Sequence, residues 1–105
     1  MEYKILKLPL TNPSKWQAFE KQNVVRRDYV AVYKGEIEER EDGDIDTILE
    51  DLFVMFNVNH PKDYYSSSLS VSDVIEITKK NEKGKKTKEW YYVNDFGFRK
   101  LDWKW

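Results

Sequence analysis

Cysteine is absent from the 105 residues, and histidine occurs once, at position 60. The missing thiols exclude disulfides, thiolate zinc sites and a cysteine nucleophile, and they fit a reducing compartment. Long apolar runs are missing as well, because the first ten residues, MEYKILKLPL, carry a charge every few positions. That pattern is unlike a signal peptide or a membrane span. We therefore expect a cytoplasmic protein with no membrane contact and no bound cofactor.

Aromatic residues are plentiful by contrast. The chain has four Trp, seven Tyr and five Phe, and each can bury a large area in a small core. A length of 105 residues suits one domain with one core. Charged residues reach 35%, yet the formal net charge is only −1, so the composition does not indicate a disordered chain. We expect a single folded domain over residues 1–105.

Hydrophobic and turn patterns predict the element order β-α-β-α-β-β-β. One helix is expected to begin at Asn12-Pro13 and to run to about Gln22, because Asn can cap a helix and Pro is tolerated in its first turn. A second helix is expected after a Thr47-x-x-Glu50 capping box, with an apolar face over residues 48–56. Strands are expected at 3–8, 28–37, 71–77, 90–93 and 98–103. Three consecutive strands at the end favour an α+β fold, with an antiparallel or mixed sheet and both helices packed on one side.

Two blocks near the C-terminal half carry a family resemblance. They are SLSVSDVI at residues 68–75 and YYVNDFGF at residues 91–98, and both are similar to the YodL-like domain. Upstream, DYVAVY at residues 28–33, LEDLF at residues 49–53 and His60-Pro61 resemble the lead-in of that domain. The resemblance extends from about residue 3 to residue 101. It implies a small protein of Gram-positive bacteria, their phages or mobile elements, working in the bacterial cytoplasm, and it assigns no catalytic residue.

Acidic side chains are concentrated between residues 36 and 51, where nine carboxylates accompany one arginine. Closely spaced carboxylates can imitate a nucleic-acid backbone and occupy a basic groove on another protein. The resulting acidic patch is predicted to bind a partner through Glu36, Glu38, Glu39, Glu41, Asp42 and Asp44. A solubilising loop that leads into a helix N-terminus explains the same residues, so both interpretations stay open.

A lysine-rich hairpin around Gly84 offers an alternative contact surface. Its lysines can hold phosphates, while the neighbouring Trp90-Tyr91-Tyr92 run can stack on bases. Alternate residues of a strand must face the core, so at least one of these aromatics is expected to be buried. The alternative site comprises Lys79, Lys83, Lys85, Lys86, Lys88 and the terminal Trp105. Trp103 is expected to pack on the sheet.

Serine chemistry has little support in the sequence. A nucleophilic Ser70 or Ser72 needs a general base, and His60 is the one histidine of the chain. Nothing in the spacing brings His60 close to either serine. Short polar side chains such as Ser70, Ser72 and Asp73 also stabilise a turn before a strand, which is the interpretation we favour.

A calcium loop starting at Asp42 is excluded, because its sixth and twelfth positions hold Thr47 and Phe53 instead of Gly and Glu. Without a catalytic or metal-binding pattern, we expect a non-enzymatic interaction protein. It would bind and modulate a host protein, such as a nuclease or another defence component, by steric occlusion or by acidic mimicry of nucleic acid. The alternative is a nucleic-acid-binding module that uses the lysine-rich hairpin.

Overall fold

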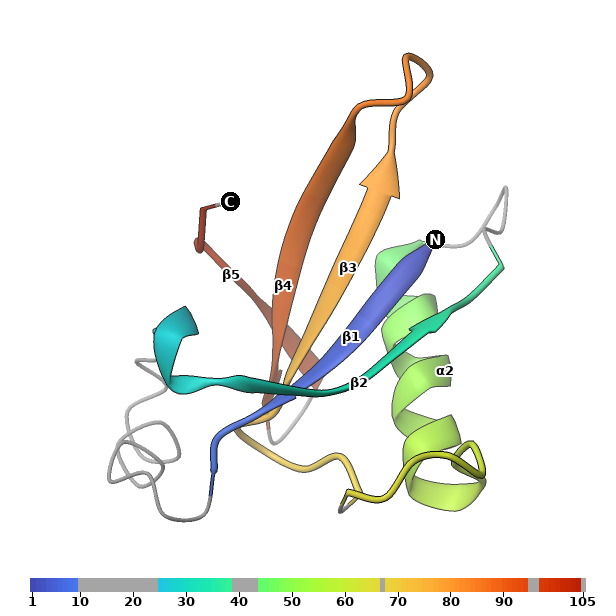
Figure 1. Cartoon of the computed structure of the whole chain (residues 1–105), viewed down its shortest axis with the longest axis vertical. Helices are drawn as coiled ribbons and strands as arrows, with labels where there is room; N and C mark the ends of the chain where they lie inside the picture. Colours follow the sequence, from blue (N-terminus) through green and yellow to red (C-terminus); the bar gives the residue numbers. More distant parts are fainter. Residues whose placement is uncertain (10–24, 39–43, 67, 95–96, 105) are drawn as a thin grey trace.

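The computed structural model describes residues 1–9, 25–38, 44–66, 68–94 and 97–104. These residues form five strands, one α-helix and a short 3-10 turn. The bounds are β1 Glu2–Lys7, η1 Arg26–Asp28, β2 Val30–Glu36, α2 Ile45–Val58, β3 Val74–Lys80, β4 Lys86–Asn94 and β5 Gly97–Leu101. Figure 1 shows α2 lying across one face of the sheet. The α+β class predicted from the sequence is therefore confirmed.

The sheet has the strand order β2-β1-β3-β4-β5, and every neighbouring pair is antiparallel. The predicted meander of the last three strands is confirmed, and the described sheet is not mixed. The helix expected from Pro13 to about Gln22 lies outside the described residues, so the described part contains one helix instead of two. That helix has 14 residues, and nothing helical in the described ranges is long and apolar enough to cross a membrane.

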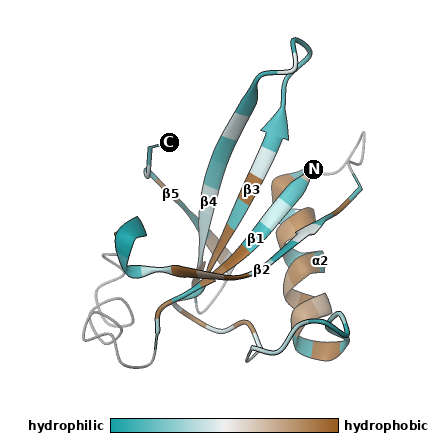
Figure 2. Ribbon diagram, in the orientation of Figure 1, coloured by the Kyte–Doolittle hydropathy of each residue, from teal (hydrophilic) through white to brown (hydrophobic). Residues whose placement is uncertain are grey.

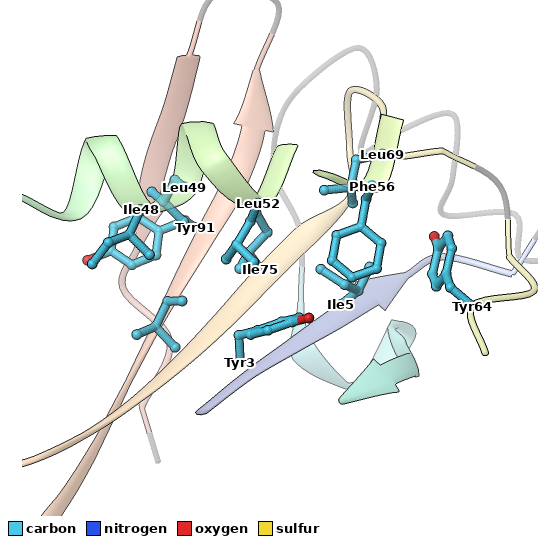
Figure 3. Packing of buried hydrophobic residues seen from close by; sticks show 11 residues of the cluster. Tyr3, Ile5, Ile48, Leu49, Leu52, Phe56, Tyr64, Leu69, Ile75 and Tyr91 are labelled. Carbon is cyan, nitrogen blue, oxygen red and sulfur yellow. The ribbon is translucent and has the colours of Figure 1, made fainter. Parts of the chain in front are cut away.

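The main core lies between α2 and the sheet. Alternate residues of β1, β3 and β4 point toward the helix, and α2 packs against them with apolar residues spaced three and four positions apart. The buried side chains in contact are Tyr3, Ile5, Ile75, Ile77 and Tyr91 from the sheet and Ile48, Leu49, Leu52 and Phe56 from α2. Figure 3 shows these side chains meeting across the interface. Burial of each aliphatic or aromatic side chain contributes about 1.5–3 kcal/mol of transfer free energy, so α2 is fixed on the sheet mainly by this contact.

The opposite face of the sheet carries a second apolar cluster beside the buried Glu76, which accepts a hydrogen bond from Trp90 Nε1 at 2.8 Å. Its buried cluster consists of Leu6, Leu8, Tyr29, Val74, Trp90, Tyr92 and Leu101, with Trp103 packed against it. The Trp103 ring lies 5.5 Å from Tyr29 and 5.9 Å from Trp90, so its predicted packing on the sheet is confirmed. Trp90, Tyr91 and Tyr92 are all buried, because β4 is covered on both faces.

The start of α2 differs from the sequence prediction. Thr47 was expected to cap the helix, but the helix begins at Ile45 and Asp44 is the N-cap. The Asp44 Oδ1 accepts hydrogen bonds from Thr47 N at 2.8 Å and from Thr47 Oγ1 at 2.9 Å. These bonds lower the pKa of Asp44 below its ordinary value. The capping-box prediction is wrong because an aspartate three residues upstream satisfies the free backbone N–H groups first.

Candidate functional site

The serine-rich segment before β3 surrounds a buried ion pair. The Lys7 Nζ lies 2.6 Å from Asp73 Oδ2, and the exposed fractions of the two side chains are 11% and 2%. The same Asp73 oxygen accepts a hydrogen bond from Ser70 N at 2.9 Å, while Lys7 also donates to Ser68 O at 3.1 Å. The pair therefore joins the end of β1 to the turn that leads into β3.

Ser72 lies in this turn with a backbone conformation that residues other than glycine rarely adopt. Its φ is 84°, and it is buried. Ser72 N donates to Val93 O at 3.1 Å, and Tyr29 donates its phenolic hydrogen to Ser72 O at 2.6 Å. Burial raises the pKa of Tyr29, so the phenol remains a donor. The expected turn before β3 is present, and the expected role of a short polar side chain is confirmed for Asp73, whose carboxylate accepts from Ser70 N. Ser70 and Ser72 contribute to these bonds through their backbone.

His60 lies on the exposed surface, just after α2. Its Nδ1 is 2.9 Å from Pro61 O, and its ring contacts Tyr64 with centroids 5.6 Å apart. Among the residues that the structure describes, no hydrogen bond joins His60 to Ser70 or Ser72. The same residues contain no group of three or more His, Asp or Glu side chains arranged to hold a metal ion. The geometry there gives neither serine an activating base.

The predicted acidic patch is divided by the fold. Glu36, Glu38 and Asp44 are exposed, whereas Glu39, Glu41 and Asp42 lie outside the described residues. Glu36 borders a hollow of about 170 Å³ whose lining also includes Lys80 and Lys86. One predicted acidic residue thus meets the predicted basic hairpin. Asp44 caps α2, and Glu36 lines the hollow. Of the three described residues of the acidic patch, Glu38 is therefore the one that is exposed and has neither role.

A groove beside α2 was not predicted from the sequence. It has a volume of about 430 Å³ and is lined by Ile37, Asp51, Val54, Met55, Val58 and Asn59. The exposed fractions of Val54 and Val58 are 52% and 79%. Figure 2 shows hydrophobic residues along much of α2. The only signal in the sequence is the four-residue spacing of Val54 and Val58, which places them on one side of the helix, off the core-facing stripe.

The basic site is partly neutralised. Glu89 Oε2 lies 2.9 Å from Lys100 Nζ, and its Oε1 lies 3.0 Å from Lys79 Nζ. Lys100, followed by Lys79 and Tyr91, lowers the pKa of Glu89 from 4.5 to about 2. Lys83, Lys85 and Lys86 are exposed, Lys88 is half-buried, and Trp105 lies outside the described residues. The expectation that at least one of Trp90, Tyr91 and Tyr92 is buried is confirmed, and because all three are buried, the alternative of stacking on bases is wrong for them.

Comparison with known proteins gives one match. The model of the YodL-like domain matches residues 7–103, which is nearly the whole chain. No curated protein and no solved structure matches significantly. The match includes the Lys7–Asp73 pair, the serine turn and the groove beside α2.

Proposed function

Because the chain belongs to the YodL-like domain family, we propose that it is a non-enzymatic interaction protein of a phage or mobile element, which binds a protein of the bacterial host. The observation that carries this proposal is the groove beside α2, where Val54 and Val58 expose apolar surface. Exposed apolar surface bordered by polar groups is characteristic of protein–protein interfaces. The groove is the contact surface of this proposal.

The charge around the groove favours a basic partner. Between Ile45 and Val58, α2 contains Asp46, Glu50 and Asp51 but no lysine or arginine. Asp51 lines the groove itself, and Glu38 follows the lining residue Ile37 in the chain. We infer a partner segment that inserts an apolar side chain and places lysine or arginine beside these carboxylates.

Basic, partly apolar surfaces are typical of proteins that bind nucleic acid. A host nuclease or another defence protein therefore fits the proposal, and occupation of its basic groove would inhibit it sterically. Burial of the half-exposed Val54 and the largely exposed Val58 supplies affinity, about 1–2 kcal/mol for each side chain. The carboxylates contribute mainly to the association rate and to selectivity, and salt weakens that contribution.

Affinity capture from bacterial lysate with paired variants tests the groove. We compare the wild type, the Val54→Ser/Val58→Ser variant and a control, Val25→Ser/Val30→Ser, in which exposed valines outside the groove are changed. We expect a defined set of proteins to be retained by the wild type and the control and to be lost with the groove variant. Equal retention by all three proteins would reject the groove as the contact surface.

The acidic contribution is tested separately on a captured protein. A variant with Glu38→Gln, Glu39→Gln, Glu41→Gln and Asp42→Asn should bind more slowly, and its affinity should depend less on salt between 50 and 300 mM, roughly the range over which screening changes most. An unchanged association rate and salt dependence would exclude acidic mimicry. Apolar docking in the groove is tested independently by the valine variants.

A further inference from the structure

The β3–β4 hairpin extends beyond both of its neighbours in the sheet. The pairing of β1 with β3 ends at Thr78, and the pairing of β5 with β4 ends at Trp90. Residues 79–80 and 86–89 therefore pair with no other strand of the described sheet. We call residues 79–89 the ribbon. Figure 1 shows the ribbon projecting at one end of the molecule's longest dimension, which is 41 Å.

The tip of the ribbon is ordered by Asn81. Its Oδ1 accepts hydrogen bonds from Lys83 N and Lys85 N, both at 2.9 Å. Its backbone N donates to Lys85 O at 2.9 Å, and its carbonyl accepts from Gly84 N at 2.9 Å. Gly84 has φ 80°, which glycine adopts without strain. The lysines are thus presented on a preorganised turn, which reduces the entropy lost on binding.

The charge of the ribbon is one-sided. Residues 79–89 contain six lysines and two acidic residues, Glu82 and Glu89, of which Glu89 pairs with Lys79. Lys80 stands directly opposite Lys86 in the register, an arrangement of like charges that destabilises a hairpin. Glu2 and Glu36 line the hollow next to these two lysines, yet within the described ranges no carboxylate lies within ion-pair distance of Lys80, Lys83, Lys85 or Lys86. Four ammonium groups therefore remain available to an anionic ligand.

We propose that the ribbon binds double-stranded DNA by entering the major groove and contacting backbone phosphates. Two paired strands lie about 4.8 Å apart, and the major groove of B-form DNA, about 12 Å wide, admits such a ribbon with its side chains. The deep, narrow major groove of an RNA duplex does not. Single strands are disfavoured because Trp90, Tyr91 and Tyr92 are buried and cannot stack on bases. The groove beside α2 uses other residues, so this inference goes beyond the proposed function.

Fluorescence anisotropy with labelled 20-base-pair DNA tests the proposal. Four lysine–phosphate contacts predict binding without sequence preference, with Kd about 1–100 µM and a slope of log K against log salt of about −3.5. We expect the DNA duplex to bind at least about tenfold more tightly than an RNA duplex or single-stranded DNA. No binding at 50 mM salt, or equal binding to the RNA duplex, would overturn major-groove insertion.

Two triple variants distinguish the effect of the ribbon lysines on DNA binding from the effect of the protein's net charge. Lys83→Gln/Lys85→Gln/Lys86→Gln should weaken DNA binding at least about tenfold and bring the slope close to −1. The control, Lys34→Gln/Lys62→Gln/Lys104→Gln, removes three exposed lysines elsewhere and should change affinity less than about threefold. All six positions are exposed, so circular dichroism should show both variants folded. Equal losses in the two variants, or tighter binding to phosphatidylserine vesicles than to DNA, would contradict the proposal.

Discussion

At the scale of single residues, the Lys7–Asp73 pair combines close contact with nearly complete burial. Removing one partner of such a pair leaves a charge without compensation in a low-dielectric environment. We predict that Lys7→Met lowers the free energy of unfolding by about 3–5 kcal/mol. Lys34→Met, at an exposed position of β2, is the control and should change it by less than about 0.5 kcal/mol. Urea denaturation of both variants measures the difference, and similar values for the two would show that the pair contributes no stability.

Ser72 allows the turn conformation to be tested without removing a hydrogen bond. Its backbone N and O make the bonds to Val93 and Tyr29, and both bonds survive a change of side chain. Because φ is 84°, Ser72→Gly should be neutral or stabilising by up to about 1 kcal/mol, whereas the β-branched Ser72→Val should cost more than about 2 kcal/mol. Thermal and urea unfolding measure both. A glycine variant as unstable as the valine variant would contradict strain at this position.

Glu89 gives a pH-dependent prediction. Its pKa in the folded protein is lowered from 4.5 to about 2, so the ionised carboxylate stabilises the fold fully above about pH 4.5. That contribution is lost as the pH falls through about 2. Glu89→Gln should therefore destabilise the protein at pH 7 by at most about 1 kcal/mol, because water screens the exposed lysines.

The difference between the wild type and Glu89→Gln should shrink steadily between pH 4.5 and the lowest pH at which the protein stays folded. Urea denaturation at several pH values measures it, with Glu82→Gln at the exposed hairpin tip as the control. A difference that stays constant as the pH falls below 3 would show that the ion pairs to Lys100 and Lys79 do not cause the stabilisation.

At the scale of elements, α2 depends on the side chains that it buries in the sheet. Leu52 is fully buried at the centre of the contact, whereas Val54, two residues later, is half-exposed in the groove. Leu52→Ala should cost about 2–5 kcal/mol, and Val54→Ala should stay within about 0.5 kcal/mol. Chemical denaturation tests this pair. A comparable loss for Val54→Ala would mean that the groove is part of the core and is not a free surface.

Elements with a strong local signal were predictable from the sequence. The apolar spacing of Leu49, Leu52 and Phe56 identified α2, and Gly84 identified the hairpin turn, because both signals depend on neighbours in the chain. The start of β4 was placed four residues too late, at Trp90, since the pairing of Lys80 with Lys86 and not local propensity extends the strand. Burial of Trp90 and Tyr92 likewise depends on the second face of the sheet, which local periodicity does not reveal.

The surfaces were less predictable than the elements. Charge separation was visible in the sequence, but the fold places Glu36 beside Lys80 and Lys86 and engages Asp44 as a helix cap. The groove depends on Ile37 lining the same hollow as Val54 and Val58, which belong to another segment of the chain. Sequence patterns cannot give such a juxtaposition unless the topology is already known.

At the scale of the whole molecule, one small scaffold carries two proposed contact surfaces: an apolar groove with acidic neighbours beside α2, and a lysine ribbon at the end of the long axis. The serine turn and the Lys7–Asp73 pair stabilise the fold, because their polar groups bond to other groups of the protein. Substitutions in either surface should therefore leave stability nearly unchanged, whereas Lys7→Met and Ser72→Val should lower it.

Site-specific photo-crosslinking in Gram-positive bacterial cells tests the groove most directly. A benzophenone amino acid replaces Val58 in one protein and, as the control, the exposed Val25 in another. We predict a discrete adduct with a bacterial protein from position 58 that is missing from position 25 and is abolished by Val54→Ser. No adduct from position 58, or the same adducts from both positions, would contradict it.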